Sequence, residues 1–148
     1  MARVELSFPD SVFTFSTEMT VRISDVNGAA HLSNEGMVAM LSEARAAFLT
    51  GHAVDETGQS GLGIIVTDLS TIFQGESFYG ERLRFEVGLT EFNRYGGDFA
   101  FRVTRVSDEA PIATAKYGFV FFDYEQRRVT PMPETFREAF EPAGHSGR

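Results

Sequence analysis

Polar side chains that can take part in acid–base chemistry are concentrated between residues 25 and 34. This stretch carries a carboxylate, two carboxamides, an imidazole and a hydroxyl, which belong to Asp25, Asn27, Asn34, His31 and Ser33. A carboxylate or an imidazole can accept a proton from water and so activate the water for attack on a carbonyl. The chain has no cysteine, which excludes a thiolate nucleophile, so any chemistry depends on oxygen and nitrogen groups.

The elements on either side of this stretch are predicted to place it at the start of a helix. Apolar and polar residues alternate over residues 12–24, as they do in a half-buried strand. Apolar residues then recur at helical spacing over residues 35–50, where Ser33 or Asn34 can cap the first turn. The first amides of a helix lack intrahelical partners, so they can stabilise a carbonyl oxygen that becomes negative during acyl transfer. Hydrolysis of an acyl group is therefore one reaction that this arrangement can support.

Each of these residues also has a purely structural interpretation. Asp25 and Asn27 are common turn residues, and Ser33 and Asn34 are common helix caps. For His31 a functional role is the simpler explanation, because an imidazole beside a helix start is better suited to a site than to core packing. His52, just after the helix, is interpreted as a partner of the negative helix C-terminus.

The rest of the chain is predicted to form antiparallel strands followed by a short helix. Alternating patterns indicate strands over residues 64–73, 81–92, 99–106 and 112–124, with a hairpin turn at Tyr95-Gly96-Gly97-Asp98 and a terminal helix in PETFREAF. One strand, one long helix and four strands joined by mostly short turns indicate an α+β domain whose sheet wraps the helix. Because Ala39 and Ala46 lie opposite its apolar face, the helix is expected to be covered over much of its circumference.

Composition narrows the classes of function. The 148 residues predict a single domain over 1–148, with a disordered tail after about residue 140. The net charge of −8 disfavours binding to a nucleic-acid backbone. The absence of a long apolar run or a signal-peptide core predicts no membrane association and a cytoplasmic location. Three scattered histidines give no zinc signature, so no metal is expected.

The order of motifs resembles the hot-dog-fold thioesterases of the 4-hydroxybenzoyl-CoA thioesterase type. Members of that family typically carry an Asp-x-Asp-x-x-Gly-His-Val-Asn-Asn-like run before a long helix that often contains Glu-Ala-Arg. This chain reads Asp25-Val26-Asn27-Gly28-Ala29-Ala30-His31-Leu32-Ser33-Asn34 and then Glu43-Ala44-Arg45. The resemblance extends over about residues 17 to 137. Asn27 stands where many relatives have the second Asp, and Ala30 stands where Gly is usual.

The resemblance implies a hot-dog fold, with an antiparallel five- to six-stranded sheet wrapped around one long central helix. It also implies an acyl-CoA thioesterase that needs no cofactor, since coenzyme A is part of the substrate. Asp25 and His31 rank first as catalytic residues, followed by Asn27, with Asn34 in the same loop. Because another branch of the family places its carboxylate on the helix, Glu35 and Glu43 are further candidates.

The same resemblance implies partners and contacts. A homodimer or a dimer of dimers (a homotetramer) is expected, with the acyl-CoA site across the subunit interface. Arg82 and Arg84, on an exposed strand face, are candidate contacts for the coenzyme A phosphates.

Two alternative functions remain open at this stage. A hot-dog enoyl-CoA hydratase or dehydratase also uses Asp, Asn and His before a helix, in a motif resembling Asp-x-Asn-Pro-x-His. Here His31 lies one residue farther from Asp25, and Gly28 replaces the proline. A non-catalytic domain that binds an acyl group is the other alternative, because Asn27 cannot act as a base at neutral pH.

Overall fold

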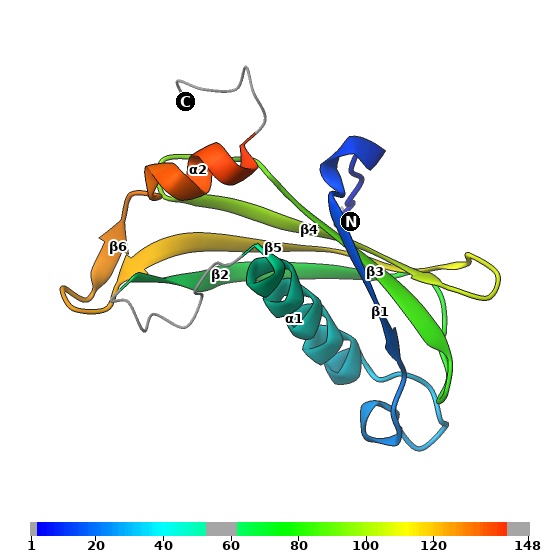
Figure 1. Cartoon of the computed structure of the whole chain (residues 1–148). Coiled ribbons are helices and arrows are strands. Elements are labelled where there is room, and N and C mark those ends of the chain that lie inside the picture. The colour runs from blue at the N-terminus through cyan, green and yellow to red at the C-terminus, as the bar shows by residue number, and fades with distance from the viewer. Residues whose placement is uncertain (1–2, 53–61, 142–148) are drawn as a thin grey trace.

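The computed structural model describes residues 3–52 and 62–141 (Figure 1). Five strands, predicted from alternating apolar and polar residues, form one antiparallel sheet together with a short sixth strand. The strands run in the order β1-β3-β4-β5-β2, and a short strand, β6, pairs with β5 beyond the end of β4. Their bounds are Phe15–Thr20 (β1), Leu62–Phe73 (β2), Arg82–Thr90 (β3), Gly96–Arg105 (β4), Pro111–Asp123 (β5) and Arg128–Thr130 (β6). The predicted antiparallel α+β sheet is confirmed.

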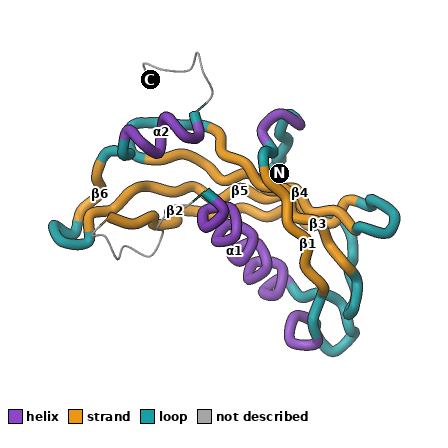
Figure 2. The backbone as a smooth tube through the Cα atoms, in the orientation of Figure 1, coloured by secondary structure: helices purple, strands orange, loops and turns teal. Residues whose placement is uncertain are grey.

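Helix α1 (Asn34–Gly51) lies across one face of this sheet, as Figures 1 and 2 show. It buries one stripe of side chains against the strands, namely Met37, Met40, Leu41, Ala44 and Phe48. Two 3₁₀ turns flank β1, η1 (Asp10–Val12) and η2 (Ile23–Asp25), so the first strand is shorter than the alternating pattern suggested. None of the helices in the described part of the chain is long and apolar enough to cross a membrane.

Aromatic side chains fill the end of the core at which α1 terminates. The ring of Phe48 lies 5.6 Å from that of Phe15 and 6.3 Å from that of Phe99, measured between centroids. The C-terminal helix α2 (Glu134–Phe140) closes this end, with Phe140 5.4 Å from Phe48. His52 caps the helix through a 2.7 Å contact between Nδ1 and the Phe48 carbonyl oxygen, as the sequence predicted.

The predicted hairpin forms, with Thr90 of β3 opposite Asp98 of β4, but Gly96 and Gly97 of the predicted turn also belong to β4. They pair with Val120 and Phe119 of β5. A Cβ atom at Gly96 would collide with the Phe119 carbonyl oxygen, so glycine is needed there for close approach of two strands and not for a turn.

The expectation that α1 is covered over much of its circumference holds for most of its positions, which are buried or half-buried. A stripe at four-residue spacing is exposed, and it consists of Glu35, Ala39 and Glu43. Residues of this stripe line the grooves beside the helix that are described below.

Phe48→Ala is expected to lower the free energy of unfolding by about 3–5 kcal/mol, because Phe48 is fully buried and its loss leaves a cavity among three other rings. Denaturant unfolding followed by circular dichroism measures this change. Thr50→Ala, an exposed position on the same helix, serves as the control and should change stability by less than about 0.5 kcal/mol. Equal losses in both variants would contradict the assigned core.

Candidate active site

The loop that leads into α1 is anchored by the buried carboxylate of Asp25. The Arg22 backbone amide donates to its Oδ2 at 2.8 Å, and the Arg22 guanidinium donates to both carboxylate oxygens at 3.1 Å. These hydrogen bonds lower the pKa of Asp25, outweighing the opposing effect of burial. A carboxylate held in this way is a weak proton acceptor, so its main effect is to fix the loop.

The backbone carbonyl of Asp25 connects the loop to the helix. It accepts hydrogen bonds from the Ser33 amide at 3.0 Å and the Ser33 hydroxyl at 3.1 Å. Ser33 in turn caps α1, because its Oγ accepts from the Gly36 amide at 2.9 Å. A Cβ at Gly36 would collide with the Asp25 carbonyl oxygen, so glycine allows the first helical turn to pack directly on the loop.

Asn27 lies in an exposed turn, and its side chain binds the local backbone. Its Oδ1 accepts from the Ala29 backbone amide at 3.1 Å, and the backbone amide of Asn27 donates to the His31 carbonyl at 2.9 Å. Ala30, at the position where the related family usually has Gly, adopts a left-handed backbone with φ 63°. The turn therefore carries backbone strain beside His31.

His31 is positioned by a segment that is distant in the sequence, the connection between β2 and β3. Its Nδ1 lies 3.5 Å from Oε1 of Glu76, and its ring lies 4.7 Å from the Phe78 ring between centroids. The two segments also pair through their backbones, since the Leu32 amide donates to the Ser77 carbonyl at 2.8 Å. With 31% of its side chain exposed, the imidazole is both held and accessible to a substrate. No sequence signal indicated Glu76 or Phe78, because this contact depends on strand topology.

A groove of about 450 Å³ opens beside the first turn of α1. It runs between the helix and β2, and its lining residues are Asn34, Glu35, Val38, Leu69, Thr71 and Phe73. Most of its surface is apolar, yet the buried Thr71 Oγ1 has no hydrogen-bond partner. The amides of Asn34 and Glu35 precede the first intrahelical hydrogen bond, so they provide donors at the same end of the helix.

Glu43 does not belong to this groove. It lines a second one, of about 560 Å³, on the β1 side of the helix, together with Met19, Thr20, Arg22, Ala39 and Met40. The structure thus leaves Asp25, Asn27 and His31 before the helix, places Asn34 at the first residue of α1, and separates Glu43 from the groove at Asn34.

The candidate phosphate contacts Arg82 and Arg84 lie on the sheet face opposite α1, since the intervening Leu83 is buried in the core. Both pair with Glu18 of β1, at 2.9 Å and 3.9 Å respectively. The geometry does not bring them together with the loop, and their role in binding phosphate stays a prediction. No group of three or more His, Asp or Glu side chains in the described ranges could hold a metal ion.

Solved structures share this fold over almost its whole extent. A 1,4-dihydroxy-2-naphthoyl-CoA thioesterase from Synechocystis is 19% identical, with a TM-score of 0.80 over 88% of this chain and 98% of that one. A Staphylococcus aureus protein solved in complex with CoA is 14% identical, with a TM-score of 0.78 over 86% of this chain and 82% of that one. The gentisyl-coenzyme A thioesterase BH1999 is 16% identical, with a TM-score of 0.75 over 85% and 99%. None of the curated proteins matches significantly by sequence.

The fold and the loop before α1 define a protein of the hot-dog thioesterase type. The family model of the thioesterase-like superfamily matches residues 21–140, and the chain belongs to that superfamily. The predicted hot-dog fold and thioesterase family are therefore confirmed, and membership supports an enzyme that hydrolyses thioesters.

Asp25→Asn is expected to destabilise the protein at neutral pH, because it removes the charge that Arg22 binds. Since the folded-state pKa of Asp25 lies below 3.8, the carboxylate's contribution is present above about pH 4 and is lost as the pH falls through the folded-state value. The stability difference between the native protein and the variant should therefore shrink below about pH 4. Denaturant unfolding at several pH values measures it, with Glu125→Gln in an exposed turn as the control. A difference that is constant with pH would contradict this account.

Ala30→Gly is expected to raise the free energy of unfolding by about 0.5–1 kcal/mol. Relief of the left-handed strain is worth roughly 1–2 kcal/mol, which exceeds the free-energy cost of the extra conformational entropy that glycine gives the unfolded chain. Ala29→Gly is the matched control, since Ala29 has no positive φ and should lose stability. Thermal and denaturant unfolding measure both variants, and the same sign in the two would argue against strain at Ala30.

Proposed function

We propose that the chain is an acyl-CoA thioesterase in which a water molecule attacks the thioester carbonyl beside the N-terminus of α1. The attack forms a carbon–oxygen bond and moves negative charge onto the carbonyl oxygen. The amides of Asn34 and Glu35, at the positive end of the helix, are suited to stabilise that charge. Collapse of the intermediate breaks the carbon–sulfur bond and releases the free acid and the coenzyme A thiol.

His31 is assigned the proton transfer. Its imidazole is partly exposed, and Glu76 and Phe78 hold it on one side, so it can take a proton from water and return one to the leaving sulfur. Asp25 is assigned to fixing the loop, because Arg22 occupies both of its carboxylate oxygens. Asn27 remains a candidate for orienting water or the thioester, whereas Glu43 in the second groove is the weaker candidate.

The groove between α1 and β2 is proposed to take the acyl group. Val38, Leu69 and Phe73 give it apolar walls, and Thr71 offers one buried hydroxyl that lacks a partner. An apolar acyl group with a polar substituent fits this lining. Two of the similar structures are a dihydroxynaphthoyl-CoA thioesterase and a gentisyl-CoA thioesterase, so aryl thioesters are among the substrates to test first.

A homodimer, or a dimer of dimers, is proposed as the working assembly. Among the described residues β2 is an edge strand of the sheet, and its exposed Leu69 and Phe73 lie along the same groove. Pairing of two copies along β2 would cover both side chains and complete the wall of the groove. A cytoplasmic location and contacts of Arg82 and Arg84 with coenzyme A phosphates belong to the same proposal.

The observation that carries this proposal is a partly exposed His31 in the loop before α1, whose first turn lines an apolar groove, in a chain of the thioesterase-like superfamily. The test is thiol release from a panel of short, long and aromatic acyl-CoAs. His31→Ala is expected to lower kcat at least about 100-fold on any substrate that turns over. His52→Ala is the matched control, because that histidine caps the far end of α1 and should leave kcat nearly unchanged.

Other outcomes would identify the alternative functions. Saturable acyl-CoA binding without thiol release would indicate a non-catalytic acyl-binding domain. Hydration of an enoyl-CoA with the thioester left intact would indicate a hydratase. Either result would overturn the proposed thioesterase activity.

A further inference from the structure

The segment between β2 and β3, residues 74–81, supplies both side-chain partners of His31 yet contains no helix or strand of its own. The Glu76 side chain is 69% exposed, and an exposed ion pair contributes only about 0–1 kcal/mol. Such a weak contact cannot by itself order a loop, because fixing each backbone residue costs roughly 1–2 kcal/mol. Backbone hydrogen bonds hold residues 74, 75, 77 and 79–81, and a further interaction holds the Glu76 backbone between them.

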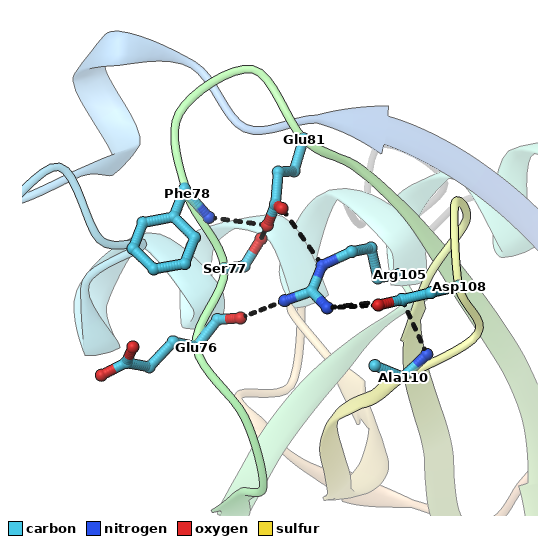
Figure 3. Close-up of polar contacts among 7 residues, drawn as sticks. All are labelled: Glu76, Ser77, Phe78, Glu81, Arg105, Asp108 and Ala110. Carbon is cyan, nitrogen blue, oxygen red and sulfur yellow. Dashed lines mark hydrogen bonds and ion pairs between the residues drawn. The ribbon is translucent and has the colours of Figure 1, made fainter.

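Arg105, the last residue of β4, makes that interaction (Figure 3). Its Nη2 donates to the Glu76 carbonyl oxygen at 2.6 Å, and its Nε lies 3.2 Å from Oε2 of Glu81. Its Nη1 donates to Oδ2 of Asp108 at 3.0 Å, in the turn that follows β4. With 17% of its side chain exposed, the guanidinium joins both ends of the segment to the sheet.

Glu81 extends this network to the residues between. Its Oε1 accepts from the Phe78 amide at 2.9 Å and from the Ser77 hydroxyl at 3.1 Å. Burial acts to raise the pKa of Glu81, but these hydrogen bonds and Arg105 together lower it, so the carboxylate stays ionised. The backbone of Glu76 and Phe78 is therefore fixed by one cation and one anion.

We propose that Arg105 is a positioning residue for His31. It fixes the backbone of residues 76–78, so that the Glu76 carboxylate and the Phe78 ring hold the imidazole in one orientation at the loop before α1. Figure 3 shows the side chains of Glu76 and Phe78 extending away from Arg105, and both reach His31. Arg105 itself is assigned no contact with substrate. The catalytic part of this inference rests on the proposed thioesterase activity.

A matched control lies three residues away on the same strand. Arg102 also binds two carboxylates, Glu86 at 2.8 Å and Asp10 at 2.6 Å. It does so on the sheet face away from α1, and neither partner leads to His31. Loss of Arg102 therefore removes a comparable pair of ionic contacts without affecting the segment at residues 74–81.

The experiment compares Arg105→Gln, Arg105→Lys and Arg102→Gln in the full chain. Nuclear magnetic resonance follows the contact between the His31 and Phe78 rings and the hydrogen exchange of the Leu32 and Tyr79 amides, which donate to Ser77 and Ala30. These readouts do not depend on turnover. On an acyl-CoA that the native protein hydrolyses, kcat and KM are measured as well.

In the Arg105→Gln variant we expect the His31–Phe78 ring contact to be lost and the Leu32 and Tyr79 amides to exchange at least about tenfold faster. Its kcat should fall about tenfold or more, while its KM stays within about threefold of the native value. Arg105→Lys keeps the charge but not the planar fork, so its kcat and exchange should be intermediate. Arg102→Gln should keep the ring contact, the exchange rates and kcat. If Arg105→Gln does not fold, Glu81→Gln tests the same network and should change the same readouts.

A folded Arg105 or Glu81 variant with native ring contact and native exchange would overturn the positioning role. Equal changes in Arg102→Gln would reduce Arg105 to a general stabiliser and would also overturn it. If the native protein hydrolyses no acyl-CoA, the resonance and exchange results still decide whether Arg105 positions His31, while the proposed function fails separately.

Discussion

The contact between the backbone carbonyl of Asp25 and the first turn of α1 is the constraint on which the site depends. It requires a buried Asp25, a capping Ser33 and a residue without a side chain at Gly36. Because Arg22 neutralises the Asp25 carboxylate, the buried charge is compensated where the loop turns. This junction sets the direction in which the helix leaves the loop, and hence where its first amides point.

Around this junction, the site is assembled from two segments that lie far apart in the sequence. The first supplies His31 and the helix start, and the second supplies Glu76 and Phe78. Each is held by its own arginine–carboxylate pair, Arg22 with Asp25 and Arg105 with Glu81. The exposed contact between His31 and Glu76 is supported on both sides, because hydrogen bonds from Arg22 to the buried Asp25 and from Arg105 to the Glu76 carbonyl fix the two backbones.

The two faces of the sheet have different roles. The face toward α1 is apolar and aromatic, and at the β2 edge it continues into the groove proposed to take an acyl group. The opposite face carries ion pairs across neighbouring strands, including Arg82 with Glu18 and Arg102 with Glu86. Charge on that face is used in cross-strand pairing, whereas the exposed Leu69 and Phe73 of β2 form the surface proposed to pack against a second copy of the chain.

The sequence by itself determined the order of the five long strands and the two helices, narrowed the helix cap to Ser33 or Asn34 and located the loop that contains His31, because these depend on local periodicity and short-range hydrogen bonds. Its run from Asp25 to Asn34 also indicated the thioesterase-like family that the comparisons confirm. It located the β3–β4 hairpin but not the second role of Gly96 and Gly97, which pair with β5, and the close approach at Gly96 is a requirement that only the neighbouring strand creates.

Only the tertiary structure decided the partners of each polar group. Asp25 and His31 rank together as catalytic candidates in the sequence, yet the Asp25 carboxylate binds the local Arg22, and the imidazole of His31 is approached by the distant Glu76. Likewise, the pairing of Arg82 and Arg84 with Glu18 and the anchoring by Arg105 follow from strand register. Contacts between residues this far apart in the chain depend on how the sheet folds over the helix, and no local pattern specifies them.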